Sequence, residues 1–155
     1  MGRIMKILVL SDSHGNIQKI KNIIESEKSF DYLIHCGDGI NDLIHVVIPD
    51  GVAVITVCGN IDRARGINGK TALVEHIHGY TFFITHGDLF GAHHDITGVW
   101  SEAKRLGCDI ACFGHTHRAM NDNVNPYMFN PGAAQSGMYG IIHINNGIKG
   151  ELKNV

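Results

Sequence analysis

The chain has 155 residues, of which 44% are hydrophobic and 18% charged, so it predicts one folded domain over residues 1–155 and excludes a disordered chain. Its 13 Lys and Arg residues nearly balance 15 Asp and Glu residues, which argues against a nucleic-acid partner and a polybasic membrane-binding face. No apolar run approaches the roughly 18 residues that span a bilayer. The N-terminal apolar run is too short for an export signal and no cysteine pair forms CxxC, so we expect reduced cysteines and a cytoplasmic protein.

Strand and helix patterns alternate in the first half of the chain. Nearly all-apolar runs predict strands buried on both faces at residues 5–10, 32–34, 52–57 and 110–113. Isoleucines at helical spacing predict a helix at residues 16–26, and further helices are predicted at 40–47 and 95–106. This alternation favours parallel βαβ units.

Later segments add strands joined by tight turns. Residues 72–76 and 80–85 flank His78-Gly79 and predict a hairpin. Residues 127–130, 138–144 and 148–153 are strand-like, with turns at Asn130-Pro131-Gly132 and Asn145-Asn146-Gly147. The pattern therefore predicts one α/β domain with two packed sheets.

Polar motifs follow five of the predicted strands in a chain that holds 11 His and 19 Gly. The strand ends read Asp12-Ser13-His14, Gly37-Asp38, Gly59-Asn60, His86-Gly87-Asp88 and Gly114-His115-Thr116-His117. The carboxyl ends of parallel strands meet at one edge of a sheet, so we expect these donors to converge there. A glycine in each motif, or directly after it, allows the backbone to turn sharply beside a ligand.

Each motif has an ordinary structural explanation when it stands alone. Asp12 could cap a helix, and Gly37-Asp38 or Gly59-Asn60 could be turns. Two histidines at alternate positions after a buried strand, as at His115 and His117, rarely serve packing. Because all five motifs follow strands in order, together they predict a metal site.

The ligand inventory favours two metal ions. Seven candidate ligands are too many for one ion that keeps a position open for substrate: Asp12, His14, Asp38, Asn60, His86, His115 and His117. One shared carboxylate divides them into two sites of four, with the ions about 3.5–4 Å apart. Two divalent cations, two aspartates and one hydroxide leave a positive centre, which suits a phosphate ester.

The ordered motifs resemble those of the calcineurin-like metallophosphoesterase superfamily, and the short chain resembles its compact prokaryotic phosphodiesterase branch. This resemblance implies two packed mixed β-sheets flanked by helices, a fold shared with a eukaryotic retromer subunit. It assigns the first metal to Asp12, His14, Asp38 and His117, and the second to Asp38, Asn60, His86 and His115. The expected cofactors are two divalent ions, with manganese first and nickel, iron, zinc or magnesium as alternatives.

Three positions depart from the family pattern. Ile61 follows Asn60 where many members have a histidine that protonates the leaving group. Asp88 stands where the branch often has histidine, and Ala133 stands where it often has serine. These departures affect the expected substrate preference rather than the metal ligands.

The resemblance implies hydrolysis of small or activated phosphodiesters by attack of a hydroxide that bridges the two metals. We expect Asn60, Arg63 and His86 to act at the phosphate, with Arg63 stabilising developing charge. Asp62 could donate a proton only if its pKa were raised, whereas nearby cations favour its carboxylate form. Good leaving groups should therefore react much faster than alkoxides.

Other functions remain open. The alternatives are a phosphomonoesterase or pyrophosphatase of the same superfamily, or a non-catalytic metal-binding scaffold. The expected partner is a small phosphodiester, and no membrane partner is expected. The resemblance to the family is the only indication of a homo-oligomer. His93 and His94 could line a substrate mouth or cover the surface, and Arg118 could meet a phosphate. Asp88 could orient a ligand histidine, and His35 is expected to be structural.

Overall fold

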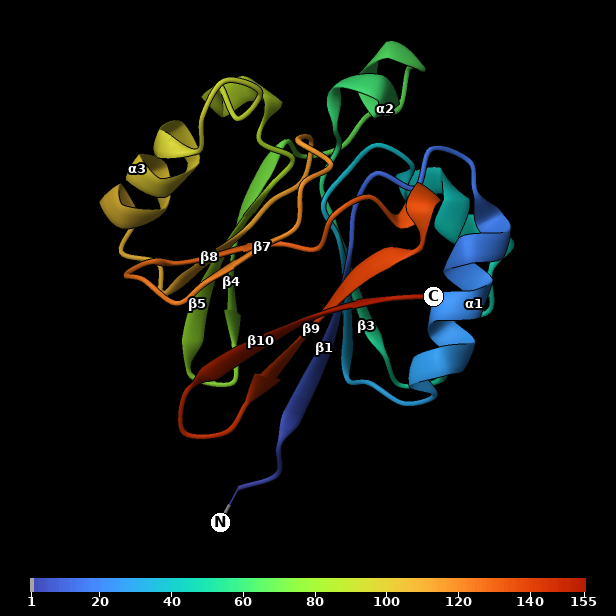
Figure 1. Cartoon of the computed structure of the whole chain (residues 1–155), viewed down its shortest axis with the longest axis horizontal. Helices are drawn as coiled ribbons and strands as arrows, with labels where there is room; N and C mark the ends of the chain where they lie inside the picture. Colours follow the sequence, from blue (N-terminus) through green and yellow to red (C-terminus); the bar gives the residue numbers. More distant parts are fainter. Residues whose placement is uncertain (1) are drawn as a thin grey trace.

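The computed structural model describes residues 2–155 and contains two five-stranded mixed sheets (Figure 1). In spatial order, the first sheet consists of β10 (Ile148–Asn154), β9 (Met138–Ile144), β1 (Met5–Leu10), β2 (Tyr32–His35) and β3 (Ala53–Thr56). Strands β1, β2 and β3 are parallel, as predicted, whereas β9 is antiparallel to β1 and β10 is antiparallel to β9. The carboxyl ends of β1, β2 and β3 therefore lie at the same edge.

The second sheet is assembled in the same way from later segments. In spatial order it contains β4 (Ala72–Ile77), β5 (Tyr80–Thr85), β6 (Ile110–Cys112), β8 (Tyr127–Asn130) and β7 (Met120–Asp122). The predicted hairpin is confirmed as β4 and β5, and β6 is parallel to both β5 and β8. Strand β7 was not predicted, because it is a three-residue edge strand that ends in two exposed polar residues and so lacks an apolar signal.

Helices cover the outer face of each sheet. In Figure 1, α1 (Ile17–Glu27) lies beside the first sheet and α3 (Thr97–Arg105) beside the second. The helix predicted at residues 40–47 is the short 3-10 helix η1 (Ile40–His45), which ends where Val46 becomes extended. Three short helices were not predicted: α2 (Asn60–Ala64), η2 (Asp88–Phe90) and η3 (Ala134–Ser136).

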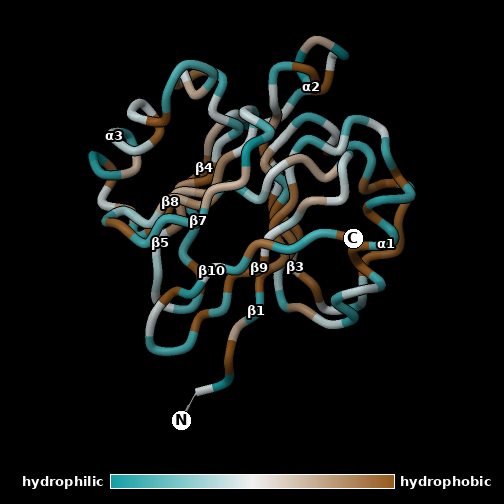
Figure 2. Tube along the Cα trace, in the orientation of Figure 1, coloured by the Kyte–Doolittle hydropathy of each residue, from teal (hydrophilic) through white to brown (hydrophobic). Residues whose placement is uncertain are grey.

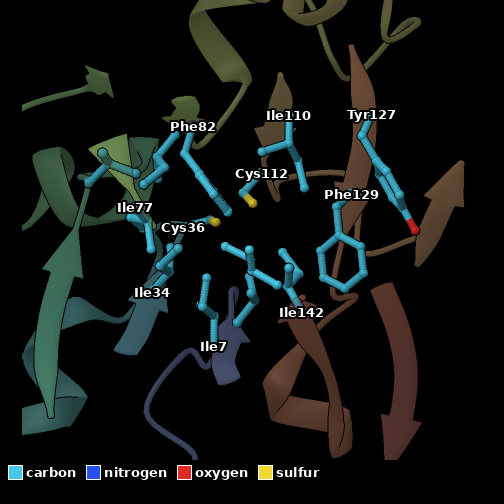
Figure 3. Packing of buried hydrophobic residues seen from close by; sticks show 14 residues of the cluster. Ile7, Ile34, Cys36, Ile77, Phe82, Ile110, Cys112, Tyr127, Phe129 and Ile142 are labelled. Carbon is cyan, nitrogen blue, oxygen red and sulfur yellow. The ribbon is translucent and has the colours of Figure 1, made fainter. Parts of the chain in front are cut away.

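Alternation along the strands divides the interior into three layers. Ile7 and Val9 of β1 face the second sheet, whereas Leu8 and Leu10 pack in the cluster that contains α1. Figure 3 shows Ile7, Ile34 and Ile142 of the first sheet opposite Phe82, Cys112 and Phe129. A third cluster packs Phe83 of β5 against Val99 and Ala103 of α3. The predicted α/β fold with two packed mixed sheets is confirmed.

The hydropathy of the trace follows this layering. In Figure 2 the hydrophobic stretches gather along the central strands, and α1 alternates between hydrophobic and hydrophilic residues. All four cysteines are buried and free of disulfides, as predicted. Among residues 2–155, no helix has the length and hydrophobicity needed to cross a membrane.

A buried carboxylate joins α1 to the first sheet. Glu27 is 8% exposed, and its carboxylate lies 3.0 Å from Lys6 Nζ and 2.7 Å from Lys153 Nζ. The hydroxyl of Tyr139 donates a hydrogen bond to it at 2.5 Å. Burial by itself raises the pKa of Glu27, but the contacts with Lys153, Tyr139 and Lys6 outweigh burial and lower the pKa to about 2.

Candidate metal centre

The loops that follow β1, β2, β3, β5 and β6 meet at one end of the two sheets, at the top of Figure 1. They bring six of the seven predicted ligands into two groups, and within each group the candidate ligand atoms lie within 4.8 Å of one another. The first group contains Asp12, His14 and His117, and the second contains Asp38, His86 and His115. Each group falls within one of the two ligand sets that the family resemblance implies.

The first group converges on one carboxylate oxygen. Asp12 Oδ1 lies 3.2 Å from His117 Nε2 and 3.5 Å from His14 Nε2. The two imidazole nitrogens are themselves 3.4 Å apart. Two nitrogens and a carboxylate oxygen at these separations form a donor set suited to a transition-metal cation.

The second group adjoins the first. Asp38 Oδ2 lies 3.2 Å from His86 Nε2, and His86 Nε2 lies 3.2 Å from His115 Nδ1. Asp38 Oδ2 is also 4.0 Å from His14 Nε2 in the first group. Asp38 therefore lies between the two groups, the place that a shared carboxylate requires.

Two buried oxygens in this region are left unsatisfied by the protein. Among residues 2–155, Asp12 Oδ1 and Asn60 Oδ1 are the buried side-chain polar atoms that have no hydrogen-bond partner. Buried acceptors are normally paired, because an unpaired one loses its hydration without compensation. Both atoms belong to the predicted ligand set, so the residues present fit a pair of cations.

The backbone at the site is strained. Five of the eight non-glycine residues with positive φ among residues 2–155 are predicted ligands, with φ between +44° and +69°: Asp12, His14, Asp38, His115 and His117. Non-glycine residues rarely adopt this left-handed conformation, which costs about 1–3 kcal/mol at each position. Such strain gathered in one place is typical of functional sites.

Neighbouring groups orient the ligand atoms. Ser11 Oγ and the His115 N–H donate to Asp12 Oδ2 at 2.6 and 3.0 Å, which leaves Oδ1 directed at the histidines. The Ile61 N–H donates to Asp38 Oδ1 at 2.8 Å. His86 Nδ1 lies 2.9 Å from the Cys36 carbonyl, and donation there leaves Nε2 free to bind a metal.

Close packing explains two of the motif glycines. A Cβ on Gly114 would lie 1.9 Å from Ser11 Oγ and 2.7 Å from Asp12 Oδ2. A Cβ on Gly59 would lie 2.1 Å from Asp38 Oδ1. Any larger residue at either position must displace a predicted ligand.

Electrostatics at the site favour added positive charge. Burial lowers the pKa of His86, but contact with Asp38 and the charges of Asp12 and Asp38 outweigh burial and raise the pKa. Burial raises the pKa of Asp38, but His86 outweighs it and the pKa falls. Burial and the charge of His86 lower the pKa of His115. The two carboxylates thus stabilise a cation at their centre, which a divalent metal supplies.

Asp62 has contacts that were not predicted from the sequence. Its Oδ2 accepts the backbone N–H groups of Asp38 at 2.7 Å and Gly59 at 3.0 Å. Its Oδ1 accepts those of Gly39 at 2.8 Å and Ile40 at 3.3 Å. Asp62 therefore ties the loop that carries Asp38 to the loop that carries Asn60. If Asp62 carried a proton to donate, its protonated oxygen would lose at least one of these hydrogen bonds. The contacts therefore support a role for Asp62 in positioning the two loops.

Arg63 and Asp88 pair across the site. Arg63 Nη2 of α2 forms an ion pair with Asp88 Oδ2 of η2, and Arg63 Nη1 donates to the Cys58 carbonyl at 3.2 Å. The pair links a loop of the first sheet to a loop of the second. The roles predicted for Arg63 at the phosphate and for Asp88 behind a ligand histidine stay predictions.

His35 lies behind the first motif in a fully buried network. Its Nε2 lies 3.0 Å from Ser13 Oγ, and its Nδ1 accepts the Gly37 N–H at 3.1 Å. Ser13 Oγ donates to Asp42 Oδ2 at 2.7 Å. Burial lowers the pKa of His35 to about 4, so it is neutral at pH 7 and serves the structural role expected from the sequence.

Known proteins share both the sequence and the fold. The chain is 34% identical over 131 residues to the probable metallophosphoesterase YsnB of Bacillus subtilis, across 83% of this chain and 75% of that protein. It is 29% identical over 154 residues to the phosphodiesterase MJ0936 of Methanocaldococcus jannaschii, across 88% of this chain and 89% of that protein. A predicted phosphoesterase of Streptococcus pneumoniae has the same fold, with a TM-score of 0.75 at 22% identity over 99% of this chain and 91% of that chain.

A family model extends the match to most of the chain. The calcineurin-like phosphoesterase superfamily domain matches residues 5–146, which include every predicted ligand and all strands except β10. The two sheets and the two ligand groups agree with the resemblance expected from the motifs. The chain therefore belongs to the calcineurin-like phosphoesterase superfamily, in its small prokaryotic and archaeal phosphodiesterase branch.

Proposed function

We propose that the protein is a metal-dependent phosphodiesterase that hydrolyses small or activated diesters with two divalent cations, manganese first among them. The observation that carries this proposal is the pair of adjoining ligand groups with two unsatisfied buried oxygens, Asp12 Oδ1 and Asn60 Oδ1. Three ligand atoms for each cation, with Asp38 between the groups and Asn60 beside them, leave coordination positions for substrate and water.

The chain's own residues hold the centre and fix its shape. Asp12, His14 and His117 would hold one cation, Asn60, His86 and His115 would hold the other, and Asp38 would be shared between them. When bound, such a pair of cations draws in phosphate oxygens and lowers the pKa of water toward neutrality. The protein contributes orientation: Ser11 and Cys36 direct Asp12 and His86, and Asp62 holds the neighbouring loops.

The residues after Asn60 explain the preference for activated diesters. Ile61 has no proton to give, and Asp62 uses both oxygens to accept four backbone N–H groups. The leaving oxygen therefore departs with little help from a proton donor at this position. Stable leaving groups such as nitrophenolate should react fastest.

A paired hydrolysis assay tests the proposal. The protein is stripped with a chelator, reloaded with Mn²⁺ and given bis(p-nitrophenyl) phosphate or p-nitrophenyl phosphate. We expect diester turnover that needs both Mn²⁺ and His14, so His14→Ala should lower kcat/KM at least 100-fold. His45→Ala is the matched control, because His45 is exposed and lies outside both ligand groups.

The other outcomes discriminate between the alternatives. Faster turnover of the monoester would favour a phosphomonoesterase. Two bound metal ions per chain without turnover of either ester would favour the scaffold. Failure to bind two ions, measured by calorimetry, would refute the metal centre itself.

A further inference from the structure

A pocket of about 410 Å³ adjoins the candidate metal centre. Its lining includes the polar side chains of His93, His94 and Arg118 and the apolar residues Ile96, Phe113 and Met120. The ring centroids of His93 and His115 are 5.9 Å apart, so the pocket begins beside the second ligand group. Its size lies within the roughly 300–1,000 Å³ range of small-molecule sites.

One segment serves both the metal groups and the pocket. After β6, His115 and His117 belong to the two ligand groups, whereas the alternate residues Thr116 and Arg118 line the pocket. A molecule held at the metal centre therefore lies beside the segment that carries Arg118. The pocket is placed to receive whatever extends from the reacting phosphate.

The charges in the pocket identify the chemistry of its ligand. Among residues 2–155, no carboxylate lies within ion-pair distance of Arg118, and the side chain is exposed. Asp95, the carboxylate in the lining, accepts the Thr97 N–H at 2.9 Å at the start of α3. A guanidinium stays charged and binds phosphate or carboxylate oxygens in pairs, so this side of the pocket favours an anion.

We propose that this pocket is a substrate subsite for an ester group that carries a second anion. This inference rests on the proposed phosphodiesterase function. The reacting phosphate lies at the metal centre, the organic part of one ester group packs against Ile96 and Met120, and its terminal phosphate or carboxylate binds Arg118. The natural substrate is then a diester in which one ester group carries a second anion and the other is the leaving group.

Three matched substrates test the subsite. They are p-nitrophenyl phosphodiesters whose second arm is propyl, carboxypropyl or phosphopropyl, so chain length is constant and only the terminal group changes. In the Mn²⁺-loaded protein we expect KM to be at least about 10-fold lower for an anionic arm than for propyl, as a charged hydrogen bond implies. The arm with the lower KM identifies the anion.

Two arginine variants locate the effect. Arg118→Gln should reduce the preference for the anionic arms to less than about 2-fold. Arg65→Gln removes the same charge from an exposed residue of the α2 loop outside the pocket and should keep the full preference. Equal KM values for all three substrates in the unmodified protein would overturn the proposal, as would a preference that survives in Arg118→Gln.

A binding measurement separates this proposal from the phosphodiesterase function. If the Mn²⁺-loaded protein hydrolyses none of the three diesters, the proposed function fails, and calorimetry then compares propane-1,3-diyl bisphosphate with propyl phosphate. Tighter binding of the bisphosphate that is lost in Arg118→Gln would still support the subsite. Equal binding of the two compounds would refute it.

Discussion

Asp62 links two metal-bearing loops through four hydrogen bonds, and Asp62→Asn disturbs them with little change in volume. The carboxylate is 2% exposed and accepts two backbone N–H groups on each oxygen. Asparagine keeps one oxygen and places an NH₂ group where the other stood. Two buried N–H donors then face a donor instead of an acceptor.

The magnitude follows from the number of bonds lost. A hydrogen bond to a charged group contributes about 1.5–3 kcal/mol, so losing two should lower the free energy of unfolding by about 3–6 kcal/mol. The loops that relax carry Asp38 and Asn60, so we also expect metal affinity to fall by about 10–100-fold.

Urea unfolding of the metal-free protein gives the stability change, and calorimetric Mn²⁺ titration gives the affinity. Asp50→Asn is the control, since Asp50 is exposed in the turn before β3 and the substitution removes the same charge. A stability loss below about 1 kcal/mol for Asp62→Asn, together with unchanged Mn²⁺ affinity, would be too small for two charged hydrogen bonds and would refute the positioning role.

Three further predictions rest on other parts of the structure. The folded pKa of Glu27 is about 2 against an ordinary 4.5, so its stabilisation is complete above pH 5 and is lost as pH falls toward 2. Across this window, acid titration should lower the stability of the unmodified protein by about 3 kcal/mol more than that of Glu27→Gln. Because Ile61 offers no proton, hydrolysis rates of aryl diesters should fall steeply as the pKa of the leaving group rises. A shallow dependence would point to another proton donor, and His93, which lies beside His115, is in a position to be that donor. Gly114→Ala should abolish binding of one metal ion while the chain stays folded, because the added Cβ would displace Asp12. Two metal ions bound per chain of this variant, measured by calorimetry, would contradict the close packing.

The fold was predictable where its signals are local. Continuous apolar runs predicted β1, β2, β3 and β6, because a strand buried on both faces is apolar throughout, and the turn at His78-Gly79 predicted the hairpin of β4 and β5. Isoleucine spacing predicted α1, because burial of one face gives a helix a period of 3.6. The short elements were not predictable in this way. Strand β7 is polar at the sheet edge, and α2 begins at Asn60, a predicted ligand within a turn motif. The sequence after residue 126 also does not indicate that β8 joins one sheet and β9 the other.

The candidate site shows the same division. Within each sheet, parallel neighbouring strands end at the same edge, so the convergence of the ligands that follow them could be expected. That the edges of the two sheets meet, and so bring Asp12 to His117, depends on how the sheets pack. The contacts of Asp62 could not be expected, because it accepts N–H groups from a loop more than 20 residues away in sequence. The pairing of Arg63 with Asp88 likewise joins loops of different sheets.

The order of motif residues and turn glycines along the chain specifies which chemical groups reach the centre, because they follow recognisable strands. The way in which those groups are held depends on the packed fold: which oxygens remain unsatisfied, which loops Asp62 joins, and that Arg118 lines a pocket beside the ligands. These features depend on the directions of backbone N–H groups and side chains in separate loops. Those directions are set by the packing of the two sheets and leave no local pattern along the chain.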